Sequence, residues 1–405
     1  MKGFVMTHSP TVIPRFPGRR PQGRPLDPPT ELAEIRERTP VARMNYPDGH
    51  LGWLVTGYHQ ARALLANPKI STRFELLHHF EHPIGPSPEN KAPLGAFHLV
   101  DDPEHARFRK PLAGKFTVRR MNLLADQIRQ FATERLDAME HAGSPVDLVE
   151  AYAWPIPAHT ICELLGVPYS DRAHFKRLAA AVSAPETTLE ERYAAFGEMN
   201  EYMSTLVQEK KRNPTDDVLS ELTTSDLNDE ELTGVASFVL GAGLETTAKM
   251  LATGTMALLQ NPEQLAAWRA DPGLTDGAVE ELMRYLTLTH TDVRAAVEDV
   301  EVDGHVIKTG KSVTISYLAA NRDPAKFPDN PEALDLRRDA SGHIGFSHGM
   351  HQCLGQQLAR VEMRIGFPAL LERFPTLRLD ADPAGLPFVD ENVYGVERLP
   401  VAWEG

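Results

Sequence analysis

The chain has 405 residues, of which 42% are hydrophobic and 24% charged, a composition typical of a globular protein with a large core. Its formal net charge of -14 argues against nucleic acid as the main partner, because nucleic-acid-binding proteins present a basic surface. No stretch approaches the roughly 20 apolar residues that a membrane span needs, and two distant cysteines give no disulfide framework. We therefore expect a cytoplasmic protein that binds neither nucleic acid nor a membrane.

Residues 1–30 are rich in Pro and Arg and predict an irregular arm. Residues 31–405 contain no internal repeat and no low-complexity linker, so we expect a single domain. Helices are predicted over residues 32–38 and 58–66, and strands over 41–46 and 52–55. The loop over residues 74–98 lacks periodicity but contains large apolar side chains, which favours a role in ligand binding.

Helical periodicity dominates from residue 102 to residue 285. The predicted helices span residues 104–116, 118–141, 154–165, 172–182, 189–212, 228–260, 263–269 and 276–285. The longest begins at a capping box of Asn228 and Glu231 and ends before Asn261-Pro262. At 1.5 Å per residue it would be about 48 Å long, enough to cross the whole domain.

The last third of the chain has a different character. Residues 300–307 predict a hairpin and residues 312–316 a strand. Residues 321–350 have little periodicity, and a helical pattern then runs from Cys353 to Phe374. The expected fold is therefore mainly α with a minor β part.

The irregular stretch ends in Phe346-Ser347-His348-Gly349-Met350-His351-Gln352-Cys353-Leu354-Gly355. A cysteine at a helix N-terminus lies among unpaired N–H groups at the positive end of the helix dipole, and both favour the thiolate, a good iron ligand. Nearby histidines make zinc as plausible as haem on these residues alone. A buried structural cysteine, the usual role of a lone Cys, stays slightly ahead of both, and a nucleophilic Cys with a His base is a further alternative.

Small residues interrupt the longest predicted helix at Gly241-Ala242-Gly243-Leu244-Glu245-Thr246-Thr247. Each glycine in a helix interior costs up to about 1 kcal/mol relative to alanine. Thr246 can donate its hydroxyl to the carbonyl of Ala242, which leaves a notch beside the carboxylate of Glu245. The hydroxyl and the carboxylate form a plausible proton-delivery pair, and tight helix packing through the glycines is the alternative.

Together and in this order, the motifs resemble those of the cytochrome P-450 superfamily, the haem-thiolate monooxygenases. The Cys353 segment resembles the family's haem-ligand signature, and residues 242–246 resemble its oxygen-binding helix motif. Glu281-x-x-Arg284 resembles its buried Glu–Arg motif, and residues 321–324 the start of its meander. The resemblance covers the chain from about residue 32 to residue 403. It implies the family's single-domain fold, with the long central helix over the haem.

By this resemblance, Cys353 is the thiolate ligand of iron in haem b, which is bound non-covalently. Thr246 and Glu245 are the expected catalytic residues, which assist oxygen binding and route protons. The other expected haem contacts are His105, Arg109, Arg294, His351, Phe346, Gly349 and Ala242. His105 and Arg109 are four residues apart and share one helix face, from which they would reach haem propionates.

The resemblance implies an enzyme that inserts one atom of O2 into a lipophilic organic substrate, by hydroxylation or epoxidation of a biosynthetic intermediate. A haem-thiolate enzyme for oxidative coupling or ring closure is the second hypothesis. A non-catalytic haem-binding protein ranks last, because it has no need of the acid–hydroxyl pair. Electrons would come from a ferredoxin and its reductase, and we expect a monomer.

Positive charge gathers near the early haem helix of this otherwise acidic chain, which suits an acidic ferredoxin. These residues are Arg107, Lys110, Lys115, Arg119 and Arg120. The segments expected to face the substrate are residues 74–97, 178–188, 239–244, 288–293 and 393–394. They are mostly apolar, and His290 and Asp292 are expected to orient a polar group of the substrate.

Overall fold

The computed structural model describes residues 12–171, 173–174, 177–178, 181, 188–389 and 393–404. Its internal contacts divide the chain into two compact units. The first comprises Met1–Ala92, Thr289–Glu332 and Ser347–Gln352, and the second comprises Pro93–Leu288, Ala333–Phe346 and Cys353–Gly405. The single domain expected for residues 31–405 stays a prediction, and most of the helix predicted at 172–182 lies outside the described residues.

The first unit is built on a six-stranded sheet with the order β1-β2-β3-β9-β6-β4. Its strands are β1 (Val12–Ile13), β2 (Val41–Asn45), β3 (Leu51–Val55), β4 (Ile70–Ser71), β6 (Thr291–Ala296) and β9 (Ser312–Ser316). Strand β9 is buried along its whole length, between β3 and β6. Because β1 pairs in parallel with β2, the expected N-terminal arm contributes an edge strand to this sheet.

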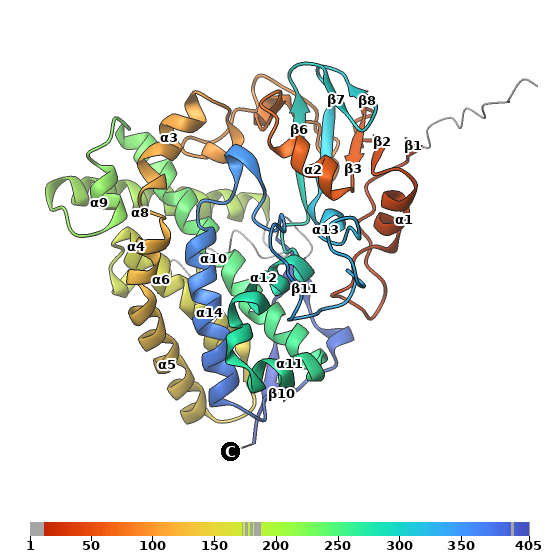
Figure 1. Ribbon diagram of the computed structural model, residues 1–405. Helices are drawn as coiled ribbons and strands as arrows, with labels where there is room; N and C mark the ends of the chain where they lie inside the picture. Colours follow the sequence, from red (N-terminus) through yellow and green to blue (C-terminus); the bar gives the residue numbers. More distant parts are fainter. Residues whose placement is uncertain are drawn as a thin grey trace, which may run out of the picture. The chain divides into compact units, whose positions relative to one another are not determined.

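The rest of the first unit consists of a hairpin, short helices and 3-10 turns around this sheet (Figure 1). The predicted hairpin is formed by β7 (Val300–Val302) and β8 (His305–Ile307). The helical segments are α1 (Thr30–Arg38), α2 (Tyr58–Leu65), α13 (Tyr317–Ala320) and the 3-10 turns η1 (Phe74–Leu76) and η6 (Gly349–His351).

The second unit is mainly helical. Its helices include α3 (Glu104–Ala113), α4 (Val118–Leu123), α5 (Ala125–Ala142), α6 (Pro155–Leu165), α8 (Leu189–Arg212), α9 (Val218–Leu222), α10 (Asp229–Gln260), α11 (Pro262–Ala270), α12 (Thr275–Leu286) and α14 (Gln356–Arg373). Helix α14 runs beside α5 and also contacts α10 (Figure 1). The mainly α prediction is confirmed, and none of the described helices has the length and hydrophobicity needed to span a membrane.

Two small sheets complete the second unit. One has the order β10 (Arg378–Leu379), β13 (Pro400–Ala402), β5 (Val146–Asp147), and the other pairs β11 (Phe388–Val389) with β12 (Gly395–Val396). Strand β12 contacts α10.

Helix α10 is the central helix of the second unit. The predicted capping box is present, with Asn228 accepting the N–H of Glu231 at 3.0 Å. Two of its glycines allow close packing, because a Cβ at Gly243 would lie 2.9 Å from the Ile161 side chain and one at Gly254 would lie 2.6 Å from Phe367. The helix therefore crosses the core in direct contact with α6 and α14.

A buried ion pair fixes the chain that leads toward Cys353. The Arg284 guanidinium contacts Glu281 at 2.6 and 2.8 Å, and both side chains are fully buried. Glu281 also accepts the N–H of Asp335 at 3.0 Å, and Arg284 donates to the carbonyl of Ala333 at 3.2 Å. Removing either charge would leave its partner buried and uncompensated, at a cost of about 3–5 kcal/mol.

Candidate functional site

Cys353 lies just before α14, which begins at Gln356, so the expectation that the helix starts at the cysteine was wrong. Its N–H donates to the carbonyl of Phe346 at 2.9 Å, which closes the intervening loop. Backbone N–H groups of Gly355 and Gln356 still bond to the sulfur. The side chain is exposed, so a small ligand can reach the thiol.

The protein around the Cys353 thiol opposes its ionisation. Desolvation by the protein atoms around the sulfur is the largest influence and raises the thiol pKa above its ordinary value, although part of the side chain is exposed. The N–H groups of Gly355 and Gln356 and the charges of Arg109 and Arg360 lower the pKa but do not outweigh burial. The sequence led us to expect that the helix terminus would favour a thiolate, but its effect alone does not outweigh desolvation. A bound metal ion would have to displace the proton.

Phe346, a predicted haem contact, is buried under the guanidinium of Arg360, which lies 4.5 Å from the ring centroid. Arg360 in turn forms a bidentate ion pair with Glu280 at 2.6 and 2.9 Å, and His343 contacts the same carboxylate at 3.1 Å. Burial would raise the pKa of Glu280, but His343 and Arg360 hold it at about 2. His343 is thus part of a structural ion-pair network beside the Cys353 loop.

His105 and Arg109 lie on one face of α3, as their spacing predicts. His105 is buried, with Nδ1 at 3.2 Å from Asp102, and burial is the largest influence that lowers its pKa. The positive charge of Arg109 also lowers the pKa of His105. Burial lowers the pKa of Arg109, which interacts electrostatically with Cys353. The second unit therefore places this cationic face within electrostatic range of the thiol.

The predicted notch in α10 is present. The Thr246 hydroxyl donates to the carbonyl of Ala242 at 2.9 Å, as expected. Ala242 and Gly241 are exposed although they lie in the middle of the central helix, and a Cβ at Gly241 would meet nothing within 4 Å. Gly243 instead packs against α6. The open position of the notch is therefore at Gly241, and the tight helix packing is at Gly243.

Glu245 is held by a neighbour that the sequence analysis did not single out. Lys249, one turn along α10, contacts the Glu245 carboxylate at 2.5 Å. The Lys249 Nζ also donates to the carbonyl of Val393 at 2.7 Å, and its side chain is 9% exposed. The predicted proton-delivery carboxylate is therefore ion-paired, and the same ammonium group binds a segment expected to face the substrate.

Arg294, another predicted haem contact, is buried on β6 in the first unit. It forms an ion pair with Asp292, and the Tyr317 hydroxyl donates to the same carboxylate at 2.6 Å. Burial would lower the pKa of Arg294, but Asp292 and Tyr317 raise it. The Arg294 Nε has no hydrogen-bond partner among the described residues. Arg294 and Tyr317 thus already engage the Asp292 carboxylate, and its expected role in orienting the substrate stays a prediction.

Three further predicted residues lie in the first unit. The Nε2 atom of His351 is 3.3 Å from the Thr72 hydroxyl. Gly349 has φ of 78°, and a Cβ there would lie 2.3 Å from the carbonyl oxygen of Leu65, so only glycine fits. His290, expected to orient the substrate, instead contacts the Arg20 guanidinium at 2.6 Å.

Glu362 is a buried titratable residue that the sequence analysis missed. It lies on α14, is 2% exposed, and hydrogen-bonds Thr160 of α6 and Thr247 of α10. Burial raises its pKa to about 8 despite these hydrogen bonds. The carboxyl group is therefore mostly neutral at pH 7 and connects three helices, with one link to the residue that follows Thr246. Only the tertiary contacts of Glu362 identify it, since no motif marks it.

The zinc alternative finds no support in the part of the chain that the structure describes. Within that part, no three His, Cys, Asp or Glu side chains converge as a metal site would require.

Comparisons with known proteins point to one family. A family model for cytochrome P-450 matches residues 159–384. Cytochrome P-450 105C1 from a Streptomyces species is 46% identical over 380 residues, which cover 93% of this chain and 95% of that protein. Pentalenic acid synthase from Streptomyces avermitilis is 40% identical over 407 residues, which cover 95% and 96% of the two chains.

A solved structure gives the same result. The crystal structure of CYP105P1 in complex with filipin I matches with a TM-score of 0.90 at 40% sequence identity, and the match covers 97% of this chain and 99% of that chain.

Because Glu362 is neutral in the folded protein, Glu362→Gln should become more stable relative to the native protein as the pH rises. Between the ordinary carboxyl pKa of 4.5 and the folded value of about 8, the folded chain keeps a proton that the unfolded chain releases. Native stability therefore falls by about 1.4 kcal/mol per pH unit in that window. Glu362→Gln should remove this fall. The unfolding free energy of the variant, relative to that of the native protein, should therefore rise from pH 5 to pH 8.

The measurement is chemical unfolding at pH 5, 6.5 and 8. Glu372→Gln, an exposed change on the same helix, is the matched control and should follow the native protein throughout. A constant difference between the native protein and Glu362→Gln would contradict the assignment of a neutral buried carboxyl.

Proposed function

We propose, from the premise that this chain belongs to the cytochrome P-450 family, that it oxidises a lipophilic organic substrate with electrons from a ferredoxin. The coarser function is established by the relatives, which include named cytochrome P-450 monooxygenases of Streptomyces. The chain is accordingly a haem-thiolate monooxygenase related to enzymes of secondary metabolism. The reaction type, the electron donor and the individual site residues are the proposed part.

The surroundings of Cys353 carry the proposal, because they suit a haem-bound cysteine. The thiol is exposed to a ligand and is approached by two N–H groups and two guanidinium groups that would stabilise a thiolate. A Cβ at Gly355 would meet nothing within 4 Å, which leaves room for a flat group. Arg109 and buried His105 offer cationic and donor groups for propionates. Arg294, His351 and Gly349 of the first unit stay predicted contacts.

When bound, haem supplies the centre at which O2 is reduced and one oxygen atom is transferred. We assign two tasks in that chemistry to α10. The exposed backbone at Gly241 and Ala242 gives a flat ligand close access to the helix. The Thr246 hydroxyl, turned toward the Ala242 carbonyl, is positioned to accept a proton and pass it on.

Glu245 would supply protons to Thr246 from the side of the helix where Lys249 lies. The 2.5 Å contact with Lys249 orients the Glu245 carboxylate. Proton transfer through Glu245 then requires this ion pair to loosen, which makes Lys249 a positioning residue for the acid–hydroxyl pair.

The proposed substrate is lipophilic because the segments expected to face it are mostly apolar. In the second unit, Tyr394 is buried and its N–H donates to the carbonyl of Leu288 at 2.8 Å, which joins two of those segments. One related protein is named pentalenic acid synthase, and a related structure is a complex with filipin I, which supports an organic molecule as the substrate. Oxidative coupling without oxygen insertion stays the second hypothesis, which the Thr246–Glu245 pair disfavours.

Fewer basic residues are available for the proposed ferredoxin surface than the five that the sequence indicates. Arg107 forms a bidentate ion pair with Glu231 at 2.6 and 2.8 Å, and Lys115 and Arg120 both pair with Glu221. The charges of these three residues are therefore largely compensated within the second unit.

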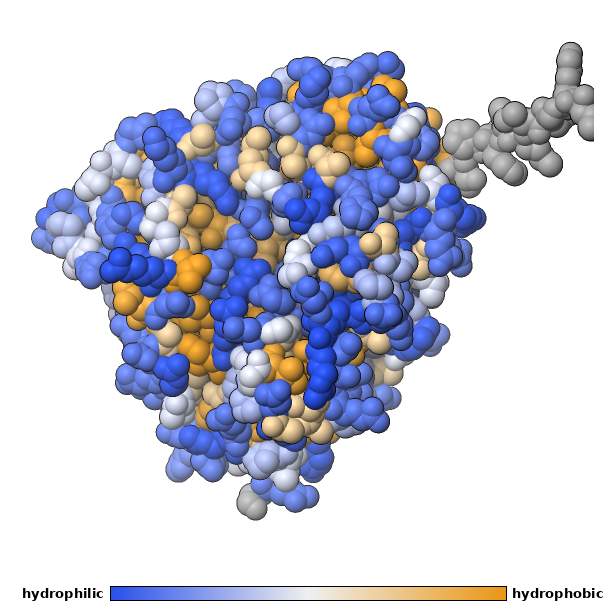
Figure 2. Space-filling model, in the orientation of Figure 1, coloured by the Kyte–Doolittle hydropathy of each residue, from blue (hydrophilic) through white to orange (hydrophobic). Residues whose placement is uncertain are grey.

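The remaining two cations, Lys110 and Arg119, are exposed and have no ion-pair partner among the described residues. On α4, next to Arg119, the side chains of Val118 and Leu123 are 55% and 75% exposed. Figure 2 shows hydrophobic surface in this region of the second unit. A mixed basic and apolar surface of this kind suits a small acidic redox protein. A monomeric state stays a prediction.

Cys353→Ser should remove the red-shifted Soret band of the carbon monoxide complex, since that shift requires thiolate ligation of iron. The measurement is the absorption spectrum of the reduced protein with carbon monoxide. Cys162→Ala is the matched control, because Cys162 is the only other cysteine of the chain and is buried. An unchanged spectrum for Cys353→Ser would refute the assignment of the ligand.

Thr246→Ala should uncouple oxygen reduction from substrate oxidation, because protons would no longer be delivered through the hydroxyl. The electrons consumed should reduce O2 to hydrogen peroxide, and substrate oxidation should fall by about tenfold or more. Both products are measured per electron consumed, with a lipophile that shifts the Soret band as substrate. Thr255→Ala removes the same kind of bond on the same helix, from Thr255 to the Leu251 carbonyl at 2.7 Å, and should keep its coupling.

Replacing Lys110 and Arg119 together with Gln should slow reduction by ferredoxin by about tenfold at low salt, because electrostatic steering is lost. Stopped-flow reduction at several salt concentrations measures the effect, which should shrink as salt rises. The control replaces two exposed cations elsewhere in the second unit, Arg212 and Arg378, with Gln. Equal rates for the two double variants would eliminate this docking surface.

A further inference from the structure

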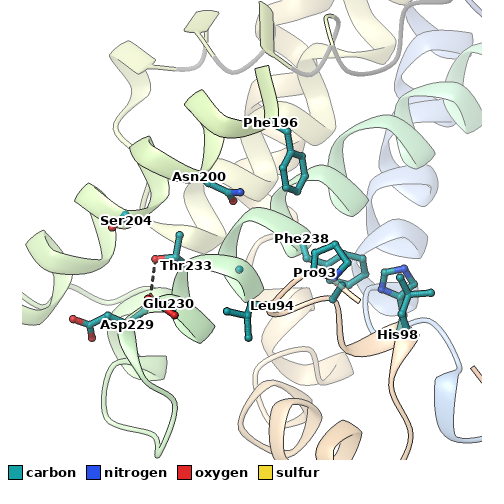
Figure 3. A pocket seen from close by; sticks show the side chains of 13 residues that line it. Pro93, Leu94, His98, Phe196, Asn200, Ser204, Asp229, Glu230, Thr233 and Phe238 are labelled. Carbon is teal, nitrogen blue, oxygen red and sulfur yellow. Dashed lines mark hydrogen bonds between the residues drawn. The ribbon is translucent and has the colours of Figure 1, made fainter. Parts of the chain in front are cut away.

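A pocket of about 470 Å³ lies along the first part of α10, between that helix, α8 and residues 93–99. Its lining shares no residue with the predicted haem and oxygen site, although Pro93, Leu94 and Ala96 come from the end of a segment expected to face the substrate. Figure 3 shows the carboxylates of Asp229 and Glu230 toward one side and the rings of Phe196 and Phe238 toward the other. The pocket is therefore amphipathic, and its volume is in the range of small-molecule sites, about 300–1,000 Å³.

The apolar side of the pocket is rigidly built. A Cβ at Gly234 would lie 2.0 Å from the carbonyl oxygen of Leu94, and one at Gly95 would lie 2.2 Å from the backbone of α10. The segment thus rests directly on the helix. The Phe238 ring is stacked on His98 at 4.4 Å between centroids and meets Phe97 edge-on at 5.0 Å. A ligand would find this apolar surface already formed, with little ordering cost.

The polar side of the pocket is negatively charged. Its lining contains two carboxylates and no Lys or Arg. Asp229 is already engaged, by Lys211 and by Gln208 at 2.6 Å. Glu230 is exposed and forms no hydrogen bond or ion pair within the described part of the chain. One carboxylate of the pocket is therefore available to a cation.

Polar groups without charge lie between the two sides. Asn200 and Ser204 line the pocket from α8, and Thr233 lines it from α10. Thr233 donates its hydroxyl to the carbonyl of Asp229 at 2.8 Å and keeps its lone pairs for a donor. From Glu230 to Phe238 the helix rises about 12 Å, which sets the length of a molecule that touches both sides.

We propose that this pocket binds a lipophilic organic ammonium ion of about that length. The cationic group lies beside Glu230, and the apolar body covers Leu94, Phe196 and Phe238. The site extends the proposed function without depending on it, because binding here requires neither Cys353 nor Thr246.

The test is calorimetric titration of the haem-loaded protein with 4-phenylbutyltrimethylammonium. A quaternary nitrogen cannot coordinate iron, and the Soret band is recorded during the titration to detect any probe that enters the haem site instead. The neutral probe is 4-phenylbutanol. The ammonium probe should bind about fivefold more tightly than the alcohol at low salt, and added salt should remove that difference.

Two variants locate the binding site. Glu230→Gln should abolish the preference for the ammonium probe and leave alcohol binding unchanged, whereas Phe196→Ala should weaken binding of both probes. Glu263→Gln, an equal charge change at an exposed position on α11, is the control and should behave as the native protein. Equal affinities of the native protein for the two probes would overturn the proposal, as would a full preference in Glu230→Gln.

Discussion

The rest of the site depends on one electrostatic balance at Cys353. Desolvation by the surrounding protein disfavours the thiolate, whereas the nearby N–H and guanidinium groups favour it. Desolvation by the surrounding protein outweighs the favourable groups and raises the thiol pKa, so the proton stays on sulfur. The opposing groups nevertheless leave the thiol ready to ionise when a cation arrives. Each of them requires a particular part of the second unit: α14 provides the N–H groups and Arg360, and α3 provides Arg109.

The fold of the second unit supports that arrangement through buried charge. The Glu281–Arg284 pair binds the chain after residue 332, and Glu280 binds Arg360 and His343. These two acids are adjacent on α12, so one helix holds both the approach to the Cys353 loop and the guanidinium over Phe346. The Cys353 loop carries a local sequence motif, but its position thus depends on contacts from residues about seventy positions earlier.

Features that depend on nearby sequence were predictable. The capping box of α10 and the Thr246–Ala242 hydrogen bond involve residues three or four apart, and both are present as expected. The two-residue strands β4 and β10 were not predicted, because their pairing partners are distant in the chain. The same reason hid Glu362, whose raised pKa comes from burial between α6 and α10. The basic cluster misled because the sequence does not show that Asp226, Glu221 and Glu231 form ion pairs with three of its five members.

Lys249 ties two properties of the enzyme to one ammonium group. Its Nζ binds both Glu245 and the carbonyl of Val393, while its methylene groups pack against Gly395. A change in the backbone path at residues 393–395 therefore shifts the group that orients the acid of α10. Under the proposed function, substrate range and efficiency of oxygen use are therefore coupled at this position. Directed evolution that alters the C-terminal segment for a new substrate would need a compensating change on α10 to restore efficient turnover.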